Sequence, residues 1–292
     1  GQSQVLHSAL TRLQESPVVA LTPTQSRILR SELLSMQHRG VGLCGDDKAS
    51  FNEASERLAA LSTQFGNHVL DATQQWTLKL PSREEVAGLP QRALEALASA
   101  AKEADESAAT AEAGPWLLGL DMPRYLPFLT HANNRSLREK AYRAHVGRAS
   151  SGEHDNRALI EEILSLKGQQ AARLGYAHWA DVSLASKMAK DVDEVEELLE
   201  ELRVAAFPAA ERELDDLKAL ARRHGAAEAE NLAPWDLPFW SEKLRQERFD
   251  LDQETLRPWF PLPQVLDGLF GLCNRLFGVV IEAADGEAPI WH

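Results

Sequence analysis

Two long stretches in which apolar residues recur at every third or fourth position constrain the fold of this chain most. The first runs from about residue 48 to about residue 73, and the second runs from 192 to 224. This spacing places the apolar side chains on one face of an α-helix, and helices of this length need neighbours that cover the face. We expect Asp191 to cap the second helix and Pro208 to kink it after Ala205.

Shorter helical patterns fill most of the remaining chain. They cover residues 2–14, 25–38, 89–105, 123–131, 136–149, 156–174 and 263–277. Polar residues at their starts are the expected caps, because a side-chain oxygen can accept from a free N–H group of the first turn. These caps are Thr22 or Thr24, Asp46 or Asp47 for the 48–73 helix, Ser136 with Glu139 as a capping box, and Asp155 or Asn156.

Strand patterns are few. Residues 76–80 (WTLKL) alternate apolar and polar side chains, and residues 116–120 (WLLGL) are a plausible pairing partner. The β-branched run 279–281 predicts one more strand, for which the chain offers no evident partner. Between the first two strands, the small and polar residues 107–114 are expected to form a mobile surface loop.

These patterns predict a mostly α fold, with long antiparallel helices and a small β-hairpin. We expect a helical domain over residues 1–278, incomplete at its N-terminal side, followed at 279–292 by the start of a strand. The chain opens at Gly1 within a helical pattern and without a methionine, which is compatible with the removal of a targeting segment upstream.

Composition narrows the functional classes. The formal net charge of −13 disfavours nucleic acid as a partner, because phosphates are bound by clustered basic side chains. No apolar run approaches the ~20 residues that a membrane span needs, so no membrane role is expected. The two cysteines, Cys44 and Cys273, match neither a disulfide framework nor a metal-binding spacing, which favours a reducing compartment.

Signatures of catalysis are absent from the sequence. It contains no H-E-x-x-H, no G-x-S-x-G and no G-x-G-x-x-G motif. His224 and Glu228 are spaced as a possible ligand pair, but Gly225 breaks the helix that would align them. The carboxylate runs 194–201 and 211–216 are typical of solvated helix faces. We therefore predict no catalytic residue and no metal ligand in this chain.

The segment from Pro234 to Leu262 holds three of the seven tryptophans and four prolines. Each proline removes a backbone donor and fixes φ, so the segment cannot be one helix. It is either a packing hinge or one wall of a ligand site. We favour tryptophans that anchor a hinge, with substrate contact proposed for Trp240 and Lys243 only. Lys243, Arg245 and Arg248 lie on the same short helix and could meet a substrate carboxylate, but we favour their interpretation as a solvent-facing basic helix edge.

Several blocks of the chain resemble the oligopeptidase A and thimet oligopeptidase family of zinc metallopeptidases, in the order and spacing of that family. They are residues 61–80 (LSTQFGNHVLDATQQWTLKL), 116–144 (WLLGLDMPRYLPFLTHANNRSLREKAYRA), 178–202 (HWADVSLASKMAKDVDEVEELLEEL), 234–244 (PWDLPFWSEKL), 256–279 (LRPWFPLPQVLDGLFGLCNRLFGV) and 290–292 (IWH), which fits the start of a W-H-x-D motif.

The resemblance implies two largely helical domains that flank a deep channel, and hydrolysis of short peptides by a zinc-activated water. In the family, the metal ligands and general base lie on an H-E-x-x-H helix and a downstream glutamate, well beyond the W-H motif. No family catalytic residue can therefore be carried onto a position of this chain, and zinc is expected only for an intact family member. The strand at 279–292 would lead into a missing catalytic half.

Three functional hypotheses follow from the resemblance. In the first, the chain is part of a zinc metallo-oligopeptidase and forms one wall of the peptide channel. In the second, it is a catalytically inactive accessory or structural subunit of a larger assembly. In the third, it is a helical module that binds peptides without hydrolysis. All three imply a soluble intracellular protein of the cytoplasm or of an organelle matrix or stroma, with short peptides, a missing catalytic half or other subunits as partners.

Overall fold

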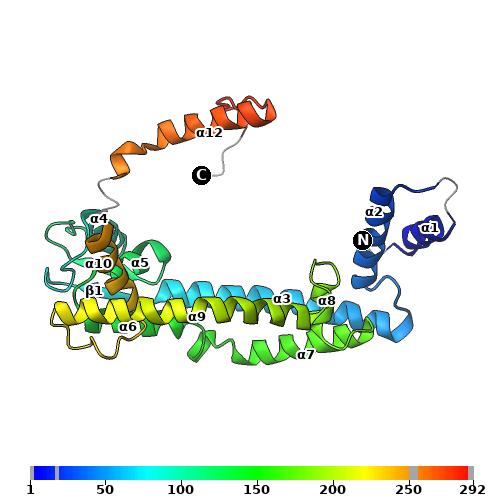
Figure 1. The fold of residues 1–292 in the computed structure, drawn as a ribbon, viewed down its shortest axis with the longest axis horizontal. Coiled ribbons are helices and arrows are strands. Elements are labelled where there is room, and N and C mark those ends of the chain that lie inside the picture. The colour runs from blue at the N-terminus through cyan, green and yellow to red at the C-terminus, as the bar shows by residue number, and fades with distance from the viewer. Residues whose placement is uncertain (1–2, 17–19, 250–255, 289–292) are drawn as a thin grey trace. The chain divides into compact units, whose positions relative to one another are not determined.

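The computed structural model describes residues 3–16, 20–249 and 256–288 (Figure 1). The chain divides into two compact units, Gly1–Phe239 and Trp240–His292. In the described ranges the regular structure is helical apart from one two-stranded sheet. The prediction of a mostly α fold with a small hairpin is confirmed. None of the helices in these ranges combines the length and apolar character that crossing a bilayer requires.

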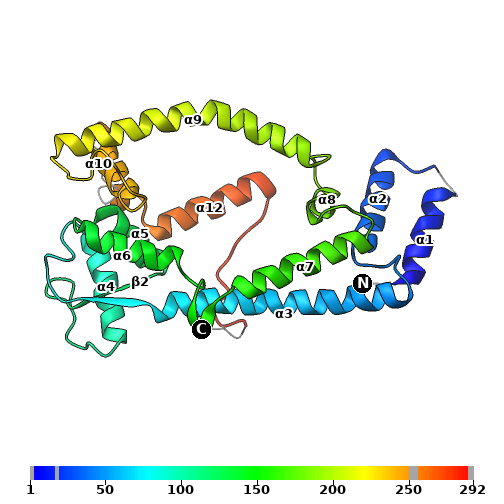
Figure 2. The same ribbon diagram turned by 90° about the horizontal axis from the view of Figure 1, so that it is seen from below.

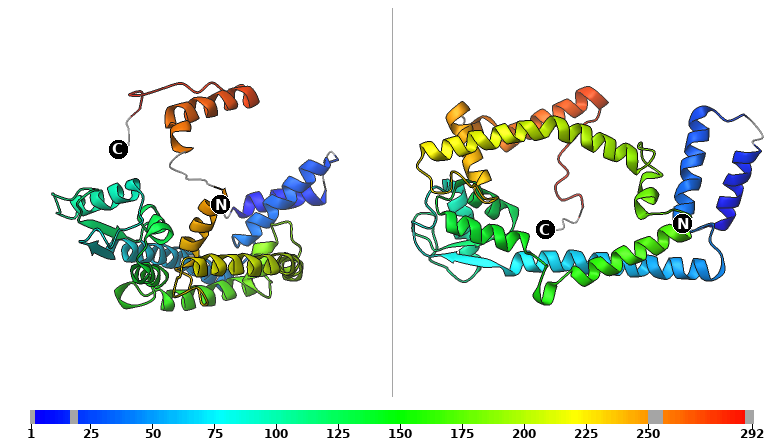
Figure 3. Two further views of the ribbon diagram at one scale, coloured as in Figure 1. Left: turned by 60° about the vertical axis from the view of Figure 1, so that its left-hand side comes forward. Right: turned by 60° about the horizontal axis from the view of Figure 1, so that its bottom comes forward.

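The first unit begins with two helices that pack together, α1 (Gln4–Glu15) and α2 (Pro23–His38), as Figure 3 shows. Thr22 is the cap of α2. Its Oγ1 accepts the N–H of Gln25 at 3.2 Å, and Oε1 of Gln25 accepts the N–H of Thr22 at 2.9 Å. This reciprocal capping box starts α2 two residues earlier than the apolar pattern predicted, with proline at its first position.

The longest helix pair is formed by α3 (Gly45–Gln75) and α7 (Arg157–Arg173), which run antiparallel side by side (Figure 2). Across this pair, Nε of Arg57 donates to Oε1 of Glu162 at 2.5 Å and Nη2 donates to Oε2 at 2.7 Å. The long antiparallel helices expected from the periodicity are therefore present. Their shared face is tied by a bidentate ion pair at its exposed edge.

The predicted cap of the helix at 48–73 is wrong. The residue that caps α3 is Cys44, whose side chain makes no capping hydrogen bond, while Asp46 and Asp47 lie inside the first turn. Carboxylates in the first turn still favour the helix through its dipole. The helix begins at Gly45, three residues earlier than predicted, directly after the extended residue Cys44.

The helix α6 (Arg135–Val146) is capped by Asn134 instead of Ser136. Oδ1 of Asn134 accepts the N–H of Leu137 at 3.2 Å, and it also accepts the hydroxyl of Ser136 at 2.8 Å. The predicted capping box was displaced by two residues because asparagine, serine and threonine are near-equivalent caps in sequence.

A small hairpin and three helices build the main apolar core. Strand β1 (Thr77–Leu80) pairs antiparallel with β2 (Trp116–Gly119), with Leu80 opposite Trp116. The helices α4 (Gln91–Glu103), α5 (Met122–His131) and α6 complete it. Trp116, Leu118 and Phe128 are fully buried in this core. The predicted strand pairing is confirmed.

Residues 107–114 are not a simple surface loop. Ala109 and Ala111 are buried, and Thr110 and Gly114 exchange two backbone hydrogen bonds of 3.1 and 2.8 Å. Ala111 belongs to the core cluster that contains Trp116, where a small side chain allows close packing.

The short helix α8 (Trp179–Leu184) contacts both α7 and α9 (Val192–Arg223). The predicted bounds and cap of α9 are confirmed, since Oδ1 of Asp191 accepts the N–H of Glu194 at 2.9 Å. The helix continues through Pro208 as one element. Whether Pro208 kinks it after residue 205 stays a prediction. The last turns bury Leu217 and Leu220.

The boundary between the two units falls inside α10 (Leu237–Phe249). The second unit also contains a 3-10 turn, η2 (Arg257–Trp259), and α12 (Leu262–Phe277). Gly278 ends α12 with a φ of 68°, a left-handed conformation that glycine adopts without steric cost. The predicted helix over 263–277 and its glycine stop are confirmed.

Residues 278–284 have no regular secondary structure, so the predicted strand at 279–281 is absent from this part of the described chain. A strand is stable only when a second strand satisfies its backbone groups, and the described residues place none beside this run. The segment 290–292 (IWH) lies outside the described residues.

Candidate functional site

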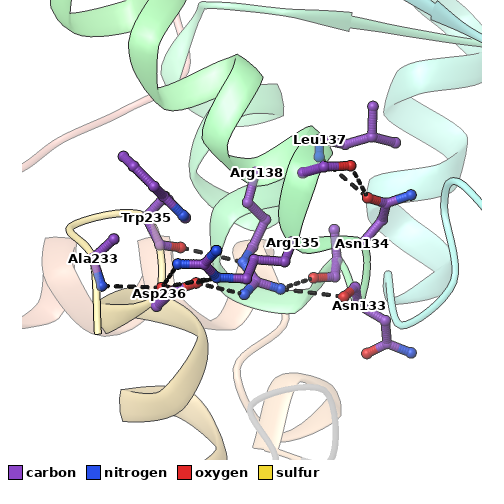
Figure 4. Close-up of polar contacts among 10 residues, drawn as sticks. Asn133, Asn134, Arg135, Leu137, Arg138, Ala233, Trp235 and Asp236 are labelled. Atoms are coloured by element: carbon purple, nitrogen blue, oxygen red, sulfur yellow. Dashed lines mark hydrogen bonds and ion pairs between the residues drawn. The ribbon is translucent and has the colours of Figure 1, made fainter. Parts of the chain in front are cut away.

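A cluster of buried charge joins α6 to the turn that precedes α10. Arg135 and Arg138 lie three residues apart on α6 and therefore project from the same face. Asp236 is the last residue before α10 and is fully buried. Figure 4 shows both guanidinium groups directed at its carboxylate. We refer to these three residues as the Asp236 cluster.

The carboxylate of Asp236 is surrounded by donors. Arg135 donates from Nε to Oδ1 at 3.0 Å and from Nη2 to Oδ2 at 2.7 Å. Arg138 donates from Nη2 to Oδ1 at 3.0 Å, and the backbone N–H of Ala233 donates to Oδ2 at 3.0 Å. Charge-assisted hydrogen bonds of this kind offset the cost of removing a carboxylate from water.

Arg138 is only 1% exposed, and its remaining donors are also used. Nη1 donates to the carbonyl oxygen of Ala132 at 2.8 Å, and Nε donates to that of Trp235 at 3.2 Å. The guanidinium carbon lies 4.1 Å from the ring centroid of Phe239, a cation–π distance. The arginine therefore ties the end of α5 to the first turn of α10.

The electrostatics fix all three side chains in their charged forms. Burial opposes ionisation of Asp236, but the hydrogen bonds from Arg135 and from the N–H of Ala233 leave the pKa of Asp236 below its ordinary value. Burial lowers the pKa of Arg138, and Asp236 acts against that shift. The hydrogen bond to Asp236 raises the pKa of Arg135. A carboxylate saturated by donors cannot serve as a general base, so the cluster is a structural lock.

Trp235 packs on the outer side of this cluster. The guanidinium carbon of Arg143 lies 4.9 Å from its ring centroid, that of Arg135 lies at 5.6 Å, and the ring of Tyr142 lies at 5.7 Å. The indole is half-buried. These contacts agree with a tryptophan that anchors the entry into α10.

The other residues of the predicted site have different surroundings. Trp240 is buried, with 3% exposure, and Lys243 is half-buried one turn later on α10. Trp259 is 78% exposed. Arg245, expected on a solvent-facing edge, is half-buried and donates to Glu242 at 2.6 Å. The three tryptophans thus occupy three environments.

Two histidines of the first unit, His68 and His145, contact side chains of neighbouring elements. Nδ2 of Asn156 donates to the carbonyl of Phe65, which leaves its Oδ1 to accept from Nδ1 of His68 at 2.8 Å. His145 stacks on Tyr125 with a centroid distance of 4.1 Å and an angle of 6°. Burial raises the pKa of Tyr125 to about 12.

Zinc does not fit the side chains that the structure describes. Nowhere in residues 3–16, 20–249 or 256–288 do three or more histidine, cysteine, aspartate or glutamate side chains come together as a metal would require.

Sequence reasoning did not identify the Asp236 cluster. Asp236 sits before a helix and within a Pro-Trp-Asp segment, so local rules assign it only a capping or turn role. Its partners lie about a hundred positions earlier and carry no local signal of the pairing. The pairing can be recognised only from the tertiary structure, which brings α6 next to the residue that precedes α10.

Comparison with known proteins identifies relatives of the whole chain. The model of peptidase family M3 matches residues 128–292. The chain is 44% identical over 293 residues to the probable cytosolic oligopeptidase A of Arabidopsis thaliana, and 44% identical over 293 residues to the chloroplastic/mitochondrial organellar oligopeptidase A of that plant. It is 36% identical over 298 residues to oligopeptidase A of Escherichia coli (strain K12).

Each of these alignments covers 100% of this chain but only part of the relative. The covered share is 42% of the cytosolic plant protein, 37% of the organellar one and 42% of the bacterial one. The chain therefore spans about two fifths of the length of the curated relatives it matches.

Proposed function

The chain belongs to peptidase family M3, and from that premise we propose that it is the helical, non-catalytic portion of a zinc metallo-oligopeptidase that hydrolyses short peptides. The observation that carries the proposal is the alignment of the entire chain with 42% of oligopeptidase A from Escherichia coli. A protein of that length has room for a zinc site outside the region that corresponds to residues 1–292. Zinc held there would polarise the scissile carbonyl and activate water.

In this proposal the residues of this chain position the helix α10 beside the peptide and take no part in the chemical step. The Asp236 cluster fixes the first turn of α10, and α10 carries Trp240 and Lys243. We propose that this region contributes one wall of the peptide channel. Lys243 is suited to the C-terminal carboxylate of a short peptide because it carries a positive charge. Trp240 would contact a substrate only where its buried ring is uncovered.

The proposal is tested with residues 1–292 alone and with the natural polypeptide that contains them. We expect the 292-residue chain to bind no stoichiometric zinc and to cleave no quenched fluorogenic peptide. We expect the natural reading frame to continue to an H-E-x-x-H motif and its product to cleave the same peptide, with loss of activity on chelation. Chelator-sensitive turnover by the 292 residues alone would overturn the assignment.

The alternative is an inactive accessory or structural subunit derived from a peptidase. The absence of H-E-x-x-H from residues 1–292 motivates it. It requires a natural polypeptide without the motif and a stable complex with other subunits. Finding an intact motif downstream removes this alternative, whereas its absence together with co-purifying subunits would establish it. Peptide binding without turnover would instead favour the peptide-binding module.

Short peptides are the proposed ligands, and the remaining part of the polypeptide is the proposed main partner. We propose a location in the cytoplasm or in an organelle matrix or stroma, which agrees with the names of the two plant relatives. The formal net charge of −13 supports no role in nucleic-acid binding.

A further inference from the structure

One face of α9 is apolar along most of the helix but is covered only at its C-terminal end. Leu217 and Leu220 are buried there against the rest of the first unit. The same face continues toward the N-terminus, at helical spacing, through four residues: Val195, Leu198, Leu199 and Leu202. We refer to these four residues as the α9 stripe.

The α9 stripe is largely open to solvent. Leu198, Leu199 and Leu202 are 57%, 58% and 57% exposed. Scattered exposed leucines are ordinary on a protein surface, but three adjacent ones in line with a buried face are not. The same face of α9 is therefore packed near the C-terminal end of the helix and open to solvent near its N-terminal end.

The edges of the stripe are acidic. Residues 193–203 contain six carboxylates and a single basic residue, Arg203, which is paired with Glu200 at 2.7 Å. Glu196 lies three residues before Leu199, and Glu201 lies three residues after Leu198, so the two glutamates border the stripe on its two sides. A partner helix with lysine or arginine along its edges would complement this surface. A second copy of α9 would bring like charges together.

We propose that the α9 stripe is the docking surface for an amphipathic helix with basic edges, supplied by the part of the natural polypeptide outside residues 1–292. The inference rests on the proposed function. The relatives of similar sequence are more than twice as long as the region they share with this chain, since that region is 42% of their length. A helix from outside residues 1–292 would supply the cover that the described residues do not give the α9 stripe.

Cysteine accessibility provides a direct test. Leu202→Cys and Val204→Cys are made separately in a background with Cys44 and Cys273 replaced by serine, in residues 1–292 and in the natural polypeptide with its other reactive cysteines also replaced. Val204 is the matched control because it is 58% exposed but lies two residues from Leu202, on the opposite side of the helix. Circular dichroism verifies folding, and a maleimide is the probe.

In residues 1–292 we expect both engineered thiols to react at similar rates. In the natural polypeptide we expect the Leu202→Cys thiol to react roughly tenfold or more slowly than the Val204→Cys thiol, because a packed thiol reacts only after local opening. Adding Glu196→Lys and Glu201→Lys should restore fast labelling at position 202. Glu197→Lys with Glu211→Lys adds the same charge away from the stripe and should not.

Three results would overturn the inference. Equal labelling at both positions in an active natural polypeptide removes the docking surface and leaves the proposed function standing. Protection of the Leu202→Cys thiol already in residues 1–292 means that the chain, or a second copy seen by light scattering, covers the stripe. A natural polypeptide that ends at His292 removes both proposals, and the reading frame alone reveals this.

Discussion

Arg138 and Asp236 lie 98 positions apart in the sequence, yet Nη2 of the arginine donates to Oδ1 of the aspartate at 3.0 Å while both side chains are buried. Arg135 approaches the same carboxylate from the neighbouring turn of α6. This pairing joins a helix of the apolar core to the first turn of α10. It makes the cluster sensitive to any change that removes one charge.

Replacing Asp236 by asparagine should be strongly destabilising. The substitution keeps the volume but leaves the buried guanidinium of Arg138 without its counter-charge, which costs about 3–5 kcal/mol of unfolding free energy. Urea unfolding of residues 1–292 measures the loss. The control is Glu162→Gln, which breaks the exposed bidentate pair with Arg57 and should lower the unfolding free energy far less, because solvent screens that pair. An equal loss of unfolding free energy for the two variants would contradict the stabilising role of the Asp236 cluster.

The effect of Asp236→Asn should depend on pH in the acid range. The pKa of Asp236 is lower in the folded protein than in the unfolded chain, where it is about 3.9. The stability that Asp236 adds is therefore fully present above that value and is lost as pH falls through the folded-state pKa. The gap in unfolding free energy between wild type and variant should narrow below about pH 4. A gap that is constant down to pH 2.5 would argue against an ionised Asp236.

A second pH dependence should come from His145. Burial, and then the charge of Arg148, lowers the pKa of His145 in the folded protein, so the unfolded chain takes up a proton first. This contribution is fully present above the unfolded value of about 6.5 and declines as pH falls below it. His145→Gln should reduce the loss of unfolding free energy between pH 7.5 and pH 5.5. An unchanged loss would assign the dependence to other groups, such as His38, whose pKa burial also lowers.

Truncation of tryptophan should separate the anchor from the exposed ring. Trp235→Ala removes a half-buried indole that two arginines and Tyr142 contact, so we expect a loss of about 2–3 kcal/mol, less than for a fully buried ring. Trp259→Ala is the matched control, because that ring is 78% exposed and its loss should stay within about 0.5 kcal/mol. Thermal or urea unfolding of both variants measures the difference.

The proposed peptide contacts on α10 should differ in kind. In the natural polypeptide, Lys243→Ala should raise KM for a short peptide with a free C-terminal carboxylate and leave KM for its amide unchanged. Trp240→Ala should instead lower the unfolding free energy by about 3–5 kcal/mol, because its ring is buried. An equal rise in KM for acid and amide after Lys243→Ala would remove the carboxylate contact.

Local patterns identified most elements because the signals are local. The bounds and cap of α9 follow from Asp191 and an apolar repeat, and the glycine stop of α12 follows from Gly278. The caps of α3 and α6 were misplaced, since adjacent polar residues compete for the same role and tertiary contacts choose between them. Residues 107–114 looked solvated because small residues suit both loops and tight packing.

The sequence by itself determined the helical periodicity, the pairing of the two strands and the family to which the chain belongs. Only the tertiary structure decided that Asp236 is locked by Arg135 and Arg138, and that α9 is covered at Leu217 and Leu220 but open at Leu198 and Leu202. The physical reason is that helices and turns depend on residues a few positions apart. Burial and ion pairing depend on which elements meet, and no short segment carries that information.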